Sequence, residues 1–160
     1  MIRFRVNGMP APQGSKSAFA LRKAGRYTGR AVVVDDNSDS LRRWRGEVAA
    51  EARVTLAPTE HGHAPDGPMA VTIMFILPRP LGHYGTGANR GALKPGAPAR
   101  PCGRRLDLDK LARSTLDALT GIAWADDGQV ADLDLAKVYQ ASPAEQPGAV
   151  IEIRTIGEDA

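Results

Sequence analysis

The sequence predicts an α+β domain in which two helices pack against one mixed β-sheet. Two observations predict this class: four stretches have the apolar or alternating pattern of strands, and two others have apolar residues at helical spacing. The expected order is strand, helix, strand, long arm, helix, strand, strand. A length of 160 residues fits one domain over residues 1–160, and 42% apolar residues is ordinary for a globular protein.

The first part of the chain contains a predicted strand and a predicted helix. Residues 2–7 alternate apolar and charged side chains, which is typical of a half-buried strand. Residues 8–14 hold two prolines and two glycines and therefore interrupt regular structure. A cluster of capping residues at 35–40 precedes apolar residues at helical spacing up to about Leu56, so we expect a helix that Pro58 ends.

The second part contains three predicted strands and a helix. Residues 69–77 form an apolar run that predicts a central strand, and residues 78–105 form a Pro/Gly-rich basic loop without regular structure. Residues 107–119 have the apolar stripe of a helix, with Asp107 as its cap. Residues 130–139 and 150–156 are predicted strands that form a loose antiparallel hairpin.

Composition excludes several classes of protein. The single cysteine, Cys102, cannot form an internal disulfide, so the chain is no disulfide-stapled scaffold. The longest apolar run is too short to cross a bilayer, and the N-terminus lacks a signal-peptide layout, so we expect a cytoplasmic protein without a membrane partner. Neither a Walker loop nor a dinucleotide glycine pattern is present, so no nucleotide cofactor is expected.

Charge is distributed unevenly along the chain. Residues 1–53 have a balance of +6, residues 54–105 of +4 and residues 106–160 of −7, for a net charge of +3. The arm at 78–105 holds six Lys/Arg and no acidic residue. A basic front with an acidic rear is typical of a phosphate-binding protein with a cation-binding centre, although small domains often have uneven charge without functional meaning.

Four aspartates are the candidates for that centre. Asp107 and Asp109 flank the start of the second helix, and Asp126-Asp127 follow a turn that can return to the same helix end. Converging carboxylates repel one another unless a divalent cation joins them, and oxygen ligands select Mg²⁺, with Mn²⁺ as the alternative. The competing interpretation is purely structural: Asp107 caps the helix, Asp109 pairs with Arg113, and Asp126-Asp127 form a turn.

Three cations lie near these acids in the sequence. Lys110 and Arg113 fall in the first turns of the helix, where either side chain can stabilise charge on a scissile phosphate. Lys137 lies on the strand after the Asp pair. The alternative is that Lys110 and Arg113 form a solvated helix face paired with Asp109 and Asp117, and that Lys137 is a surface lysine.

The motifs together resemble the RusA family of Holliday-junction resolvases. They are Asp107-Leu108-Asp109-Lys110-Leu111, Leu116-Asp117-Ala118-Leu119-Thr120, Asp126-Asp127-Gly128-Gln129-Val130 and Lys137. The N-terminal strand with Pro10, Pro12 and Gly14 behind it, Trp44-Arg45 with Val48, and the late strand pair resemble that family as well. The resemblance covers most of the chain and is weakest over residues 57–105.

The resemblance implies a RusA-like fold and a homodimeric, Mg²⁺-dependent endonuclease that cuts four-way DNA junctions by paired symmetric nicks. Such proteins are often phage- or prophage-encoded, which places them in a bacterial host cell. Carried over by motif, the metal-binding acids are Asp107, Asp109 and Asp127. The family commonly has Asn where this chain has Lys110, and Lys where it has Arg113. Arginine keeps the charge needed for transition-state stabilisation but cannot transfer a proton.

The sequence leads to the hypothesis that these acids and Arg113 or Lys110 form the catalytic site, and that basic residues grip the flanking DNA backbone. The predicted DNA-binding residues are Lys16, Arg22, Lys23, Arg45, Arg104, Arg105 and Lys137. The rival hypotheses are a branched-DNA binding protein without catalysis, an adaptor protein that uses the arm for protein contacts, and a flap or branch nuclease without strict four-way preference.

Overall fold

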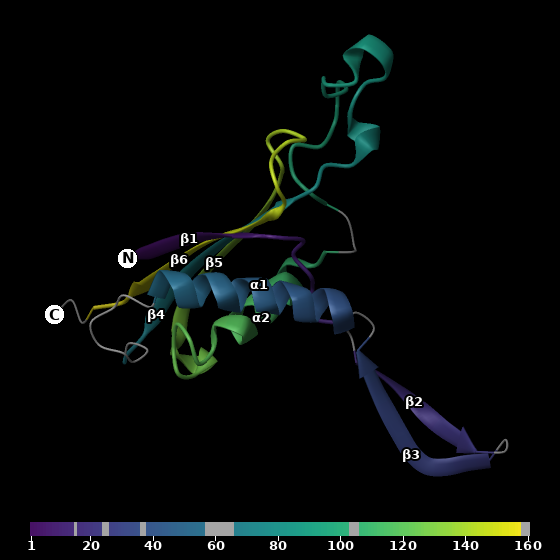
Figure 1. The fold of residues 1–160 in the computed structure, drawn as a ribbon, viewed down its shortest axis with the longest axis vertical. Coiled ribbons are helices and arrows are strands. Elements are labelled where there is room, and N and C mark those ends of the chain that lie inside the picture. Colours follow the sequence, from purple (N-terminus) through teal and green to yellow (C-terminus); the bar gives the residue numbers. More distant parts are fainter. Residues whose placement is uncertain (15, 24–25, 36–37, 57–65, 103–105, 158–160) are drawn as a thin grey trace.

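Four strands form one mixed sheet in the order β1-β6-β4-β5 (Figure 1). The computed structural model describes residues 1–14, 16–23, 26–35, 38–56, 66–102 and 106–157. The sheet strands are β1 (Ile2–Asn7), β4 (Met69–Leu77), β5 (Val130–Tyr139) and β6 (Gly148–Thr155). The other elements are strands β2 (Lys16–Lys23) and β3 (Arg26–Asp35), helices α1 (Ser38–Leu56) and α2 (Leu108–Leu119), and the 3₁₀ turns η1 (Leu81–His83), η2 (Gly87–Asn89) and η3 (Asp127–Gln129).

Strand β4 is central, as the apolar run at 69–77 predicts. It pairs antiparallel with β6 on one side and parallel with β5 on the other. Val71, Ile73 and Phe75 are at most 1% exposed, because their face of the sheet packs against the helices. This burial supplies the apolar area that drives folding.

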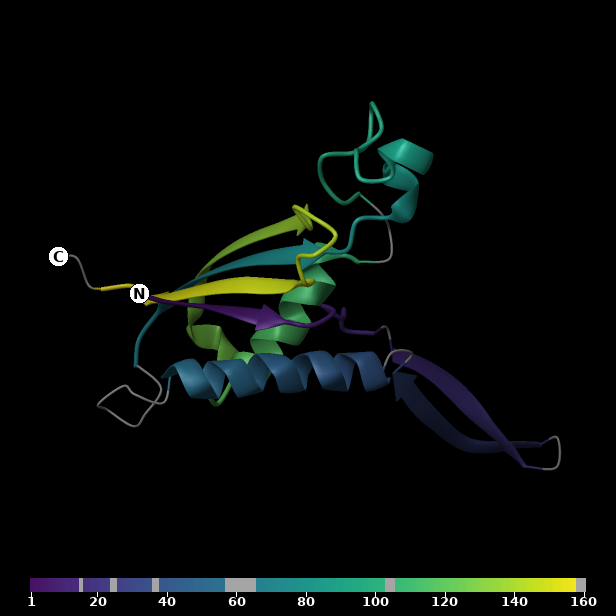
Figure 2. The same ribbon diagram turned by 45° about the horizontal axis from the view of Figure 1, so that its top comes forward.

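Both helices lie on the same face of the sheet (Figures 1 and 2). Trp44 of α1 is fully buried, and its Nε1 donates to Thr115 Oγ1 of α2 at 3.1 Å. A buried indole N–H needs such an acceptor. Trp124 is also fully buried, so both tryptophans belong to the core. None of the described helices has the length and apolarity that a membrane crossing requires.

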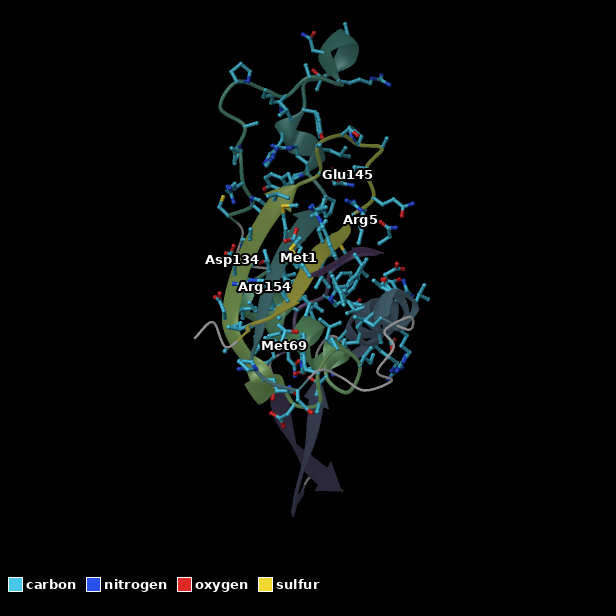
Figure 3. The ribbon with its side chains drawn as sticks, turned by 90° about the vertical axis from the view of Figure 1, so that its left-hand side faces the viewer. Met1, Arg5, Met69, Asp134, Glu145 and Arg154 are labelled. Atoms are coloured by element: carbon cyan, nitrogen blue, oxygen red, sulfur yellow. The ribbon has the colours of Figure 1, made fainter. Side chains whose placement is uncertain are left out.

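The uncovered face of the sheet carries charged pairs. Arg3 of β1 pairs with Glu152 of β6 at 3.2 Å, and Arg154 of β6 lies 3.5 Å from an acid of β5, Asp132. Arg5 contacts Glu145 at 3.3 Å, and these two lie side by side in Figure 3. This face of the sheet is therefore polar, whereas the face that packs against the helices is apolar.

The predicted fold class is confirmed, but the predicted hairpin between the last two strands is wrong. β5 and β6 do not pair; β6 inserts between β1 and β4, whereas β5 pairs with β4 in parallel. Burial explains the difference. Ala149, Ile151 and Ile153 of β6 are nearly inaccessible and need neighbours on both sides, while residues 131–134 of β5 are exposed and suit an edge.

A second difference concerns residues 16–23 and 26–35, for which no element is predicted. They form the two antiparallel strands of a hairpin, β2–β3, with Phe19 opposite Val32 and Ala18 opposite Val33. The β-branched run at residues 32–34 is the signal that favours a strand here. The hairpin extends away from the sheet in both ribbon views (Figures 1 and 2).

The arm at residues 78–105 is more ordered than its composition suggests. Within its described part, 78–102, lie the two turns η1 and η2 and a bridge between Tyr84 and Leu93. The guanidinium of Arg79 stands 4.3 Å from the centroid of the Tyr139 ring, and His83 meets that ring edge-on at 5.4 Å. These contacts attach the arm to the carboxyl end of β5.

Candidate active site

The start of α2 presents two of the predicted acids. Asp107 has extended backbone angles (φ −64°, ψ 129°) just before the helix, yet its side chain caps no backbone N–H. Its Oδ2 instead lies 3.5 Å from the ammonium of Lys110. Asp109 lies in the first turn, is exposed, and has no ion-pair partner among the described residues. Asp107 therefore occupies the predicted cap position without a capping hydrogen bond, and the alternative Asp109–Arg113 ion pair does not occur among the described residues.

Residues 8–14 hold this helix in place. Gln13 N donates to Lys110 O at 3.0 Å, and the hydroxyl of buried Ser114 lies 2.7 Å from Ala11 O. The Pro/Gly composition of residues 8–14 explains these hydrogen bonds. Backbone N–H and C=O groups of an irregular segment are not paired within it, so they can bond to a neighbouring helix. The first turns of α2 are thus fixed relative to β1.

Cations surround the two acids. Lys137 reaches across from β5 and donates from Nζ to Leu106 O at 3.0 Å, one residue before Asp107. Arg113 follows Asp109 by four residues, so both lie on the exposed side of α2. The positive end of the helix dipole adds to this field. Such an arrangement of acids and cations suits a site that binds a phosphate beside carboxylates.

Asp126 and Asp127 lie at the other end of α2. Asp126 has a structural role, because its carboxylate accepts from Gly128 N at 2.8 Å, and Gln129 Oε1 accepts from Asp126 N at 3.2 Å. Asp127 is exposed, and no ion pair to it occurs within the described ranges. This contrast favours Asp127 over its neighbour as a functional residue.

The expected return of the Asp pair to the start of α2 is therefore wrong for a single chain. Twelve residues of helix separate the two ends by about 18 Å. The turn after the helix closes at its carboxyl end, since Ala123 N donates to Leu119 O and Gly121 N to Trp124 O. The chain then enters β5 directly. The ten residues of this strand run back toward Asp107, so Asp127 stays at the far end.

The family model for Endodeoxyribonuclease RusA matches residues 13–154. The chain belongs to the RusA family. No curated protein matches it significantly. Membership makes this chain an endodeoxyribonuclease and implies Holliday-junction endonuclease activity, which confirms the resemblance carried by the Asp motifs.

RusA-type nucleases generally depend on a divalent metal ion. In the part of the chain that the structure describes, no three His, Cys, Asp or Glu side chains lie close enough to hold such an ion together. Asp107, Asp109 and Asp127 are all within that part. In this structure, Asp107 and Asp109 therefore do not belong to one such group with Asp127.

The predicted DNA-binding residues fall into three groups. Lys16, Arg22 and Lys23 lie on β2, whose side chains are outside the described structure, and Arg104 and Arg105 are outside the described residues altogether. Lys137 is close to Asp107, since its ammonium binds the carbonyl of the preceding residue. The arm and the β2–β3 hairpin leave the molecule at the end where α2 begins, opposite the chain termini (Figure 2). Two basic projections thus flank Asp107 and Asp109 at that end.

Arg45, a predicted DNA-binding residue, contacts two neighbouring segments of the chain. One of its terminal nitrogens, Nη2, donates to Gln13 Oε1 at 2.6 Å and also contacts the Asp117 carboxylate. The side chain is about one-third exposed. Arg45 of α1 therefore links this helix to two other segments, because its guanidinium donates to Gln13 in residues 8–14 and to Asp117 in α2. Its contact with DNA stays a prediction.

Sequence reasoning missed the residues that anchor the arm. Arg79 stacks on Tyr139 and also donates to Pro98 O at 2.9 Å, and Lys94 donates to Gly82 O at the same distance. Two of the arm's cations therefore stabilise its own shape. No local pattern signals these contacts, because they join residues far apart in the chain.

Proposed function

We propose that this RusA family member resolves four-way DNA junctions by paired symmetric nicks in the presence of Mg²⁺, with Mn²⁺ as a substitute. It acts as a homodimer and uses Asp107, Asp109 and Asp127. The observation that carries the proposal is the family match over residues 13–154 together with the exposed carboxylates of Asp109 and Asp127 at the motif positions. In a phage or prophage setting, it would work in the bacterial cytoplasm.

The reaction is hydrolysis of a DNA phosphodiester. A bond forms between phosphorus and a water oxygen, a bond from phosphorus to a sugar oxygen breaks, and negative charge builds on the phosphate oxygens. Arg113 is the better candidate to stabilise that charge. Lys110 already pairs with Asp107 at 3.5 Å, whereas Arg113 is exposed and makes no ion pair among the described residues.

The two basic projections would hold the arms of the junction. Arg90 and Arg100 are exposed on the arm, and the hairpin sequence from Lys16 to Arg30 contains only basic charges. Contacts of this kind are made to phosphates, so junction affinity should fall steeply as the salt concentration rises. A two-fold dimer would present two sites to a nearly symmetric junction.

The test uses a labelled synthetic four-way junction, with duplex, flap and single-stranded DNA as controls, in Mg²⁺ and in Ca²⁺. Paired symmetric nicks on the junction alone, in Mg²⁺, support the proposal. Tight binding without cutting would leave a branched-DNA binding protein. Equal cutting of flaps and junctions would instead assign a branch nuclease. Absence of DNA binding at physiological salt would favour an adaptor.

Arg113→Ala should reduce the cutting rate on the order of 10- to 1000-fold, because it removes the charge that stabilises the transition state. Arg113→Lys, which restores the residue common in the family, should retain most of the rate. Single-turnover cutting of bound junctions measures both. Arg43→Ala, an exposed residue of α1, is the matched control and should leave the rate unchanged. Equal rates for wild type and Arg113→Ala would remove Arg113 from the site.

A further inference from the structure

The arm at residues 78–105 has no apolar core in its described part. None of residues 78–102 is buried. Backbone hydrogen bonds hold the shape of this part instead, such as the one from Gly85 N to Ala92 O at 2.9 Å. Because so little apolar area is buried, little free energy fixes where the arm stands relative to the sheet. Its position therefore depends on the contacts at its two ends.

The outgoing end of the arm stands on the ring of Tyr139. The Arg79 guanidinium lies 4.3 Å from the ring centroid, and His83 meets the ring edge-on at 5.4 Å. Tyr139 is itself fixed by the sheet, because it is in register with Leu77, the last residue of β4, which is 2% exposed. Arg79 also donates to Pro98 O at 2.9 Å and so joins the outgoing and returning halves of the arm.

The returning end of the arm is held by the same strand, β5. Lys137 lies two residues before Tyr139 and donates from Nζ to Leu106 O at 3.0 Å. Asp107 follows Leu106 directly, and Asp109 lies in the first turn of α2. Side chains two residues apart on a strand point to the same face, so one face of β5 holds both ends of the arm. The arm is thus attached to the strand that also holds the start of α2.

The charge of the arm indicates its ligand. No acidic residue lies between residues 78 and 105, and the nearest acids along the chain after it are the two at the start of α2. Arg79 and Lys94 donate to carbonyl groups within the arm. Arg90 and Arg100 are exposed, and their side chains have no partner among the described residues. Two such guanidinium groups on a segment without acids suit the phosphates of DNA.

We infer that Tyr139 is a positioning residue for DNA binding: its ring holds the arm at Arg79, so that Arg90 and Arg100 bind phosphates of the DNA beside the cut. The inference rests on the proposed function for the identity of that DNA. Tyr139 carries no charge, so it displaces no counterion from DNA itself. A loss of phosphate contacts in a Tyr139 variant therefore comes through the arm.

The salt dependence of junction binding by the full chain, measured in Ca²⁺, tests this inference. Each phosphate contact contributes about 0.9 to the slope of log affinity against log salt concentration. Arg90→Gln combined with Arg100→Gln should lower that slope by about two, which corresponds to about 10- to 100-fold weaker binding at ~0.1 M salt. Tyr139→Leu should lower it by a similar amount. Tyr139→Phe keeps the ring face and should bind like wild type.

A triple variant separates positioning from a general loss of structure. Once Tyr139→Leu has released the arm, removing Arg90 and Arg100 should cost little more, so the triple variant should have the slope of Tyr139→Leu alone. Single-turnover cutting by Tyr139→Leu at saturating protein should stay near the wild-type rate, because the acids are unchanged. Arg43→Gln with Arg53→Gln, both exposed on α1, is the matched control and should keep the wild-type slope.

Three results would each overturn the inference: a wild-type slope in Tyr139→Leu, an additive loss in the triple variant, or an equal loss in Tyr139→Phe. The proposed function is judged separately, by junction cutting in Mg²⁺. If wild type cuts junctions and the arm variants keep its slope, the inference is wrong and the function stands. If wild type binds junctions but cuts none, the function fails, and the slopes still decide the role of Tyr139. Absence of junction binding by wild type would overturn both.

Discussion

Asp109→Asn should abolish junction cutting while leaving junction binding intact. Asparagine keeps the size of the side chain but removes its negative charge, which the proposed reaction needs. Asp109 is exposed and makes no ion pair among the described residues, so the fold does not depend on that charge. Removing a carboxylate that repels phosphate should leave binding equal or slightly tighter. The cutting rate should fall by at least about 100-fold.

Binding by gel shift in Ca²⁺ and cutting in Mg²⁺ measure the two effects separately. Asp39→Asn is the matched control, since Asp39 also lies in the first turn of a helix and its side chain is 89% exposed. It should bind and cut like wild type. Cutting that persists in Asp109→Asn, or loss of binding with the fold intact, would contradict the role given to this acid.

Phe75→Ala should lower the free energy of unfolding by about 3–5 kcal/mol. Phe75 of β4 is fully buried, in register with Ala149 of β6 and Lys137 of β5. Truncation removes the transfer free energy of the ring and leaves a cavity that paired strands on both sides cannot close. Because domains of this size are stable by only about 5–15 kcal/mol, the loss is a large fraction of the total.

Urea unfolding followed by circular dichroism measures the change as a shift in midpoint at constant slope. Val54→Ala is the control, because Val54 is 73% exposed on α1, and its effect should stay within about 0.5 kcal/mol. A Phe75→Ala midpoint close to that of wild type would mean that β4 is not the centre of the core.

Local pattern accounts for most of the elements. The strands at 2–7, 69–77 and 130–139 and both helices were predicted within a few residues of their observed ends, because alternation and helical spacing are properties of neighbouring residues. Pattern does not specify a partner. The position of β6 between β1 and β4 follows from burial on both sides, which only the assembled sheet defines.

For the candidate site too, the sequence predicts the residues and the tertiary structure decides their positions. Residue type and spacing single out four aspartates, and the resemblance to the RusA family selects Asp107, Asp109 and Asp127 among them. Neither predicts the distances between these side chains, because a turn after a helix can lead in either direction. Packing decided that direction: the 120–124 turn closes against Leu119 and Trp124, and the chain enters β5 at the far end of α2.

The amino-acid sequence therefore determined the chemistry available to this protein: four aspartates, their cationic neighbours, and the elements that carry them. The tertiary structure alone decided which of these groups meet. It assigned Asp126 to a turn and Arg45 to a helix contact, and it left Asp127 apart from Asp107 and Asp109. The physical reason is that secondary structure depends on local interactions, whereas proximity depends on how buried surfaces fit together over the whole chain.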